Sequence, residues 1–143
     1  MGSITNPLLK KTLRQGSVWK MPLLSITEPH FLIVLNKNPL SGKLILLSLI
    51  TSKVQKRLEI ILKTGKPLST IVQFGPEEYD ELDRPSCVDC NTLKSVDASF
   101  FDHAVDLPNA HPCNDLPAPL LKRIIDGILE SPGVSPSLKT LIR

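Results

Sequence analysis

The chain has 143 residues, 41% of them hydrophobic and 22% charged, which is typical of one globular domain that buries its own core. Its longest apolar runs, FLIVL and LILLSLI, are far shorter than the roughly 20 residues of a membrane-spanning helix, so we expect no membrane segment. The three cysteines follow no disulfide pattern and no secretory signal opens the sequence, so we expect a cytoplasmic protein.

The net charge of +3 is unevenly distributed along the chain. Residues 1–72 contain eleven Lys and Arg side chains against two Glu, a balance of +9, whereas residues 73–143 have a balance of −6. A basic half of this kind can attract a polyanion such as nucleic acid. The two halves can equally neutralise each other across the folded protein.

The N-terminal residues 1–15 predict an arm or a short helix, with Leu8, Leu9 and Leu13 available to dock one face. Gly16 then begins the first strand. Two apolar runs, PHFLIVLN and KLILLSLIT, each have the length of a strand. The linker between them, KNPLSG, is rich in turn-forming residues, so we expect an antiparallel hairpin.

Nearly every position of these two runs is apolar, which indicates that both faces of the hairpin are covered. Residues 53–66 fit a helix or a strand equally well. PLSTIVQF predicts a further strand, GPEEYDELDRP an acidic loop or single turn, and SCVDCNTLKSVD a strand with a turn near Cys90. Asp97 then has the position of an N-cap for a short helix, ASFFDHAV.

The clearest helix in the sequence covers residues 115–131, where leucines and isoleucines recur at helical spacing. Asn114 or Asp115 can cap its first turn, and Ser135 with Pro136 predicts one last helical turn. With strands first and one strong helix last, residues 16–143 predict a single α+β domain. The simplest such fold is a small β-barrel with a C-terminal helix.

The cysteines provide the most motif-like spacing in the chain. Cys87 and Cys90 are followed by His103, His111 and Cys113, and all five could ligate zinc. If SCVDC is a strand, however, residues three apart point to opposite faces, so the two thiols diverge. We therefore expect small buried thiols, with no metal and no other cofactor, and keep Cys87 and Cys90 only as weak metal candidates.

A second cluster of chemically active residues surrounds the apolar hairpin. His30 lies at the mouth of the first run, where it could act as a proton shuttle or as a hydrogen-bonded strand-end residue. Thr51 and Ser52 end the second run and display two hydroxyls. The cations that follow, Lys53, Lys56 and Arg57, make this turn a candidate for phosphate contacts, or a solvated basic turn.

Five segments in order, spanning about Gly16 to Ser131, resemble the MazF/PemK toxin family. GSVW resembles its opening strand, and EPHFLIVLN stands where that family has an arginine-proline pair followed by a buried strand. LILLSLITS, RPSCVDCNTLKSVDASFF and LPAPLLKRIIDGILES resemble its next strand, its late strand pair and its final helix.

The resemblance implies an SH3-like β-barrel that forms a homodimer. It also implies a metal-independent endoribonuclease that acts on single-stranded RNA and is silenced by a cognate antitoxin. In that reaction a 2′-hydroxyl attacks the adjacent phosphate, so the site must accept a proton, donate one and stabilise phosphoryl charge. Thr51 and Ser52 match the family's threonine-serine pair.

The family's arginine is replaced by Glu28, directly before Pro29. Three explanations are open. Glu28 and His30, which share one face of an extended segment, could form a different base–acid pair. Arg57 or Arg84 could reach the site from elsewhere. Alternatively, the fold has lost cleavage and is a binding module for a protein or nucleic acid.

Overall fold

The computed structural model describes residues 3–23 and 26–143. Within these residues the helices are α1 (Pro7–Thr12), α2 (Val54–Thr64), α3 (Ala98–Ala104), α4 (Ala118–Glu130) and α5 (Pro136–Ile142), with a 3₁₀ helix, η1, at Leu68–Thr70. The strands are β1 (Val18–Leu23), β2 (Ile26–Val34), β3 (Leu44–Thr51), β4 (Ile71–Phe74), β5 (Ser86–Asp89), β6 (Lys94–Asp97) and β7 (His111–Cys113).

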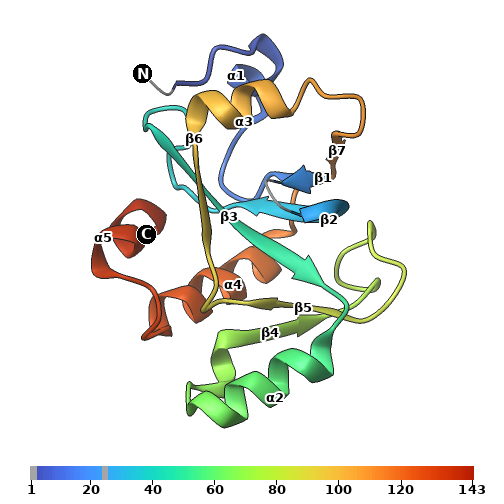
Figure 1. Cartoon of the computed structure of the whole chain (residues 1–143), viewed down its shortest axis with the longest axis vertical. Helices are drawn as coiled ribbons and strands as arrows, with labels where there is room; N and C mark the ends of the chain where they lie inside the picture. Colours follow the sequence, from blue (N-terminus) through green and yellow to red (C-terminus); the bar gives the residue numbers. More distant parts are fainter. Residues whose placement is uncertain (1–2, 24–25) are drawn as a thin grey trace.

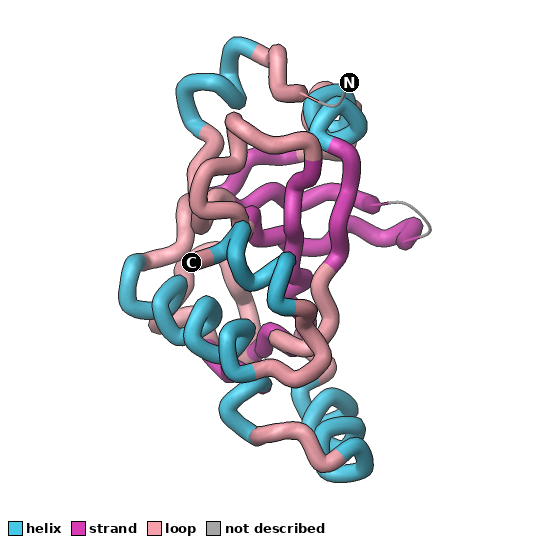
Figure 2. Tube along the Cα trace, turned by 90° about the vertical axis from the view of Figure 1, so that its left-hand side faces the viewer, coloured by secondary structure: helices cyan, strands magenta, loops and turns pink. Residues whose placement is uncertain are grey.

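The strands form one open antiparallel sheet, in the order β4-β5-β3-β2-β1-β7, with β6 paired to β3 (Figure 1). β3 is the central strand. One of its edges pairs with β2, and the other pairs with β6 along its first half and with β5 near its end. The predicted α+β class is confirmed. The helices α1 and α3 lie at one end of the molecule and α2 at the other (Figures 1 and 2).

The predicted hairpin of β2 and β3 is confirmed, with Phe31 opposite Ile50. Successive side chains along β2 enter two different cores, because strand residues alternate between faces. Ile33 belongs to the core that α4 covers, and Leu32 belongs to the core that α1 and α3 cover. Both faces of the hairpin are therefore buried, as its continuous apolar sequence predicts.

The ambiguous segment after β3 is a helix. Ile61 is its buried residue and packs with Ile71 and Cys87 on the outer side of β4 and β5. Gly65 ends the helix at φ +71°, a left-handed conformation that side chains other than glycine rarely adopt. This helix stands between strands, so the expected order of strands first and one helix last is wrong in this respect.

The C-terminal helix α4 is shorter at its start than the predicted 115–131, and neither Asn114 nor Asp115 caps it; the N-cap is Pro117. Both polar residues are engaged elsewhere. The Asn114 N–H donates to Glu81, and Asp115 pairs with Arg14 at 3.1 Å. Asp97 and Ser135 are the N-caps of α3 and α5, as predicted.

Two other segments differ from their predictions. PLSTIVQF is a strand only over its second half, because Leu68–Thr70 turns as a 3₁₀ helix. The proline-rich segment before α4 contains the short strand β7, which pairs with β1.

The described part of the N-terminal arm is held in place by one buried carboxylate on α3. Asp102, 6% exposed, accepts hydrogen bonds from the Thr5 N–H, the Thr5 hydroxyl and the Asn6 N–H at 2.8–2.9 Å. Leu9 is fully buried and Leu13 nearly so in the core beneath, whereas Leu8 remains half exposed. The arm is therefore a packed element that includes the short helix α1.

We expect Asp102→Ala to lower the free energy of unfolding by about 2–3 kcal/mol, since it removes charge-assisted bonds and leaves buried N–H donors unsatisfied. Chemical denaturation would measure this loss, and limited trypsin digestion should show new cleavage at Lys10 and Lys11. Asp126→Ala, which removes an exposed carboxylate paired with Lys122, is the control and should change neither. Unchanged stability and protease resistance in Asp102→Ala would contradict this account of the arm.

The hydrogen bonds that hold the N-terminal arm to Asp102 should weaken in acid. Burial by itself would raise the pKa of Asp102, but the hydrogen bonds from Asn6 and Thr5 outweigh it and lower the pKa below its usual value. A group with a depressed pKa in the folded state stabilises the protein above the unfolded-state pKa, and this contribution disappears as the pH falls through the folded-state value. The protection of α1 amides against hydrogen exchange, measured relative to the intrinsic rate at each pH, should therefore fall below about pH 4, at a higher pH than the protection of the β2–β3 hairpin.

Candidate functional site

A groove of about 420 Å³ lies at the open end of the β2–β3 hairpin, where β2 begins and β3 ends. We call it the main groove. Figure 1 shows the loop between β4 and β5 beside this end of the sheet. The groove brings together six of the site residues predicted from the sequence. These are Glu28, His30, Thr51, Ser52, Lys53 and Arg84.

Two local structures position the hairpin side of the main groove. The register that pairs Phe31 with Ile50 makes His30 and Thr51 the next residues along the two strands. Beyond Thr51 the chain turns into α2, and the Lys53 N–H donates to the Thr51 hydroxyl oxygen at 3.1 Å. Since that bond uses the oxygen as an acceptor, the hydroxyl proton can be directed toward a ligand.

The opposite wall is the acidic loop of residues 75–85. Tyr79 anchors it: the ring is 1% exposed, and the hydroxyl donates to the Asn114 carbonyl at 2.6 Å. The ring also meets Phe31 edge to face, with centroids 6.4 Å apart. Burial, reinforced by nearby acidic groups, raises the pKa of Tyr79, so its hydroxyl remains a donor. The loop thus holds Arg84 at the groove.

The charges in the main groove are mixed. Three cations and two carboxylates line it: Lys20, Lys53 and Arg84, with Glu28 and Asp83. Arg84 pairs with Asp83 at 2.9 Å, and its hydrogen bond and charge lower the pKa of that carboxyl. Both side chains are well exposed, so this pair is weak and an anionic ligand can compete for Arg84. The Lys20 ammonium lies 4.9 Å from the centre of the Phe31 ring.

Lys20 was not among the residues predicted from the sequence. It lies on β1, and only the pairing of Lys20 with Phe31 brings its side chain to the groove. Phe31, Leu82 and Ser86 also line the groove and were likewise missed. For Lys20, the one signal in the sequence was a lysine within the otherwise apolar segment VWKMPL.

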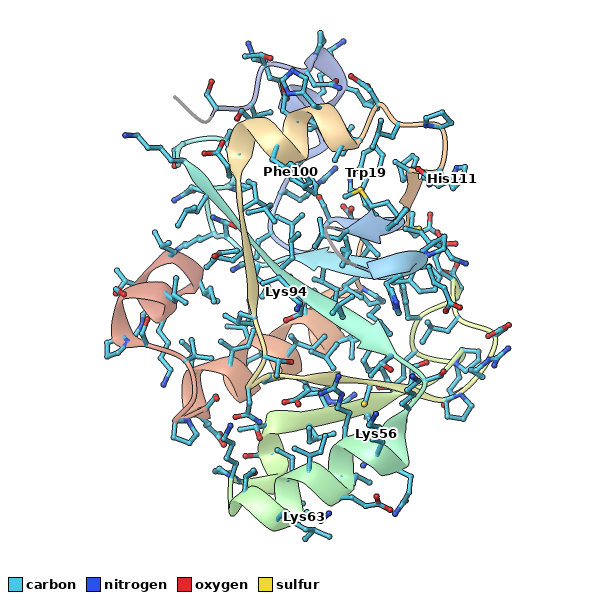
Figure 3. The ribbon with its side chains drawn as sticks, in the orientation of Figure 1. Trp19, Lys56, Lys63, Lys94, Phe100 and His111 are labelled. Carbon is cyan, nitrogen blue, oxygen red and sulfur yellow. The ribbon has the colours of Figure 1, made fainter. Side chains whose placement is uncertain are left out.

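A smaller hollow of about 240 Å³, which we call the side groove, adjoins the main groove and shares His30, Thr51 and Lys53 with it. Its other lining residues are Leu49, Arg57, Asp89, Thr92 and Lys94. Arg57, a predicted phosphate contact, is therefore close to His30, but it pairs with the buried Asp89 at 3.6 Å. Lys56, the remaining predicted contact, lies on α2 and lines neither groove (Figure 3).

The cysteines diverge as the strand spacing predicts. Cys87 packs against Ile61 beneath α2, whereas Cys90 lies in the α4 core with its sulfur 3.5 Å from the Ile124 carbonyl oxygen. Desolvation by burial raises the pKa of Cys87 to about 11 and that of Cys90 to about 12. Across residues 3–23 and 26–143, no three His, Cys, Asp or Glu side chains are grouped to hold a metal ion.

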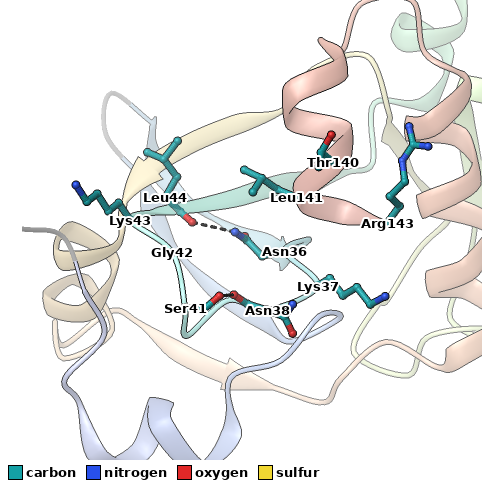
Figure 4. Close-up of a pocket in the computed structure, with 10 residues that line it drawn as sticks. All are labelled: Asn36, Lys37, Asn38, Ser41, Gly42, Lys43, Leu44, Thr140, Leu141 and Arg143. Carbon is teal, nitrogen blue, oxygen red and sulfur yellow. Dashed lines mark hydrogen bonds between the residues drawn. The ribbon is translucent and has the colours of Figure 1, made fainter.

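Another hollow, of about 320 Å³, lies between the β2–β3 loop and α5 (Figure 4). It has cations on its rim, but Lys37 and Lys43 extend in opposite directions (Figure 4). Asn36, its buried polar residue, bonds the backbone of Leu44 and Leu46 and so has a structural role. The arrangement does not converge on a ligand.

None of the helices in the described part of the chain is both long and apolar enough to cross a bilayer. No protein-family model matches the sequence, and no curated protein matches it either. The resemblance to the MazF/PemK family is therefore a prediction from the five sequence segments alone.

The reactivity of the three thiols tests the burial of Cys87 and Cys90 directly. Cys113 is partly exposed and has a pKa of about 11, raised chiefly by burial. At pH 8 all three thiols are thus protonated in the folded protein, and the thiolate is the reactive form. We expect Ellman's reagent to modify Cys113 slowly, faster as the pH rises toward 11, and Cys87 and Cys90 only on unfolding. Rapid reaction of Cys87 or Cys90 in native protein would contradict their burial.

Proposed function

We propose that this protein is a metal-independent endoribonuclease of the MazF/PemK type, which cleaves single-stranded RNA in the main groove. One observation carries the proposal: Glu28, His30, Thr51 and Arg84, distant in sequence, line one groove. These residue types supply what the reaction needs, namely a proton acceptor, a proton donor, a hydroxyl and a cation.

In the proposed reaction, the Glu28 carboxylate accepts the proton of the 2′-hydroxyl as its oxygen attacks phosphorus. His30, as the imidazolium, donates a proton to O5′ as the P–O5′ bond breaks. The products are a 2′,3′-cyclic phosphate and a free 5′-hydroxyl. Residues i and i+2 of a strand are about 6–7 Å apart on one face, so the two side chains can flank a phosphate.

Arg84 takes the role of the missing arginine in this proposal. It lines the main groove and its guanidinium is exposed, whereas Arg57 lies in the side groove and is tethered to Asp89. Arg84 and Lys53 would stabilise the additional charge on the phosphoryl oxygens, and the Thr51 and Ser52 hydroxyls would donate hydrogen bonds to them.

The proposal includes the SH3-like barrel, the homodimer and the protein antitoxin that the resemblance implies. The antiparallel neighbours β5-β3-β2-β1, and the packing of α4 on the core that contains Ile33, are compatible with such a barrel, although the sheet of the described residues is open. The uneven charge along the chain supports a polyanionic substrate.

A second candidate is a binding module that holds RNA or a protein in the same groove without cleaving it. The position of Glu28 favours this candidate, because a carboxylate in place of the family's arginine does not stabilise the additional charge that cleavage places on the phosphoryl oxygens.

The deciding experiment incubates purified protein with a long single-stranded RNA in EDTA. We expect discrete fragments with cyclic-phosphate ends from the wild type. His30→Ala should lower the rate about 10²–10⁴-fold, because it removes the proton donor, and Arg84→Ala about 10²-fold or more.

Lys63→Ala is the matched control, since Lys63 is exposed on α2 and lines neither groove. It should cleave at the wild-type rate. Intact RNA at high concentrations of protein whose fold is confirmed by circular dichroism would overturn the nuclease. Tight retention of RNA or of a protein partner under those conditions would establish the binding module.

A further inference from the structure

The side groove continues the main groove across the end of the β2–β3 hairpin. The two hollows share His30, Thr51 and Lys53. Strand alternation directs His30 and Thr51 to the face that also carries Leu49, and Leu49 lines only the side groove. A long ligand bound at His30 can therefore extend in two directions: past Arg84 in the main groove, or past Lys94 in the side groove.

The side groove is more uniformly cationic than the main groove. Lys53, Arg57 and Lys94 line it, and its one carboxylate is Asp89. That carboxylate is 6% exposed, pairs with Arg57 and accepts hydrogen bonds from the backbone and side-chain N–H groups of Asn91. Its charge is thus largely neutralised within the protein, so the groove attracts an anion.

The size of the side groove indicates what kind of anion fits. At about 240 Å³ it is below the roughly 300–1,000 Å³ of pockets that enclose a whole small molecule. It also shares His30, Thr51 and Lys53 with the main groove. The hollow suits part of a longer ligand that passes through both grooves, and a chain with regularly spaced phosphates matches its cations.

We propose that the side groove is a second RNA subsite, which holds the phosphate and ribose of the nucleotide next to the one bound at His30. Lys94 contacts the phosphate. This inference rests on the proposed function, because it assumes single-stranded RNA as the ligand. It adds that substrate recognition extends across the strand ends onto β6.

The test is a binding measurement that does not depend on catalysis. A fluorescent random-sequence 12-mer of 2′-O-methyl RNA has the same phosphates but no free 2′-hydroxyl, so it cannot be cleaved. Fluorescence anisotropy at several salt concentrations gives Kd and its salt dependence for the wild type, Lys94→Gln and Lys63→Gln. Figure 3 shows Lys94 on β6 and Lys63 on α2, away from it.

We expect Lys94→Gln to raise Kd about fivefold and to reduce the slope of log K against log salt by about 0.7, the loss of one phosphate contact on a single strand. Lys63→Gln should change neither. Identical behaviour of the two variants, or no binding of the 12-mer by the wild type, would overturn the subsite.

The two proposals fail separately. If the 12-mer binds in a Lys94-dependent way but RNA stays intact in the cleavage assay, the nuclease is wrong and the subsite belongs to a binding module. If RNA is cleaved and Lys94→Gln leaves both Kd and the salt slope unchanged, the subsite is wrong and the nuclease stands.

Discussion

The register of the β2–β3 hairpin is the constraint on which the rest of this structure depends. With Phe31 opposite Ile50, alternate residues of both strands enter two separate cores. A shift of one residue would exchange every side chain between the two faces. It would also move His30 away from Thr51, and the two grooves would lose the wall that they share.

The hairpin alone makes only half of the candidate site. The other half is a loop with five acidic residues, Glu77, Glu78, Asp80, Glu81 and Asp83, which would repel one another if they were held together without support. Tyr79 provides that support through its buried ring, and the Asn114 segment binds Glu81 and Asp80. Arg123 on α4 pairs with Glu78 at 2.6 Å. The loop wall is therefore fixed by the Glu78–Arg123 ion pair, by hydrogen bonds from Asn114 and by one aromatic anchor.

Folding neutralises part of the uneven charge of the chain and leaves other cations at the main groove. Arg14–Asp115 and Arg57–Asp89 each join a cation of residues 1–72 to a carboxylate of residues 73–143, so part of the imbalance is neutralised on folding. Lys20 and Lys53 instead line the main groove together with Arg84. Arg57 illustrates how the two roles meet, because it pairs with Asp89 and still lines the side groove.

The sequence by itself determined the elements whose signals are local. The apolar runs predict the hairpin, Asp97 and Ser135 predict helix starts, and the spacing of Cys87 and Cys90 predicts divergent thiols; periodicity and capping depend on neighbours in the chain. It also identified Glu28, His30, Thr51, Ser52 and Lys53 as groove residues from the ends of the two apolar runs. Only the tertiary structure decided that α2 is a helix, because burial of Ile61 against β4 resolves an ambiguous pattern. Likewise, Lys20, Arg84 and Lys94 reach the grooves through strand pairing and through the anchoring of Tyr79. Those contacts join residues far apart in the chain, and no local pattern encodes the distance between them.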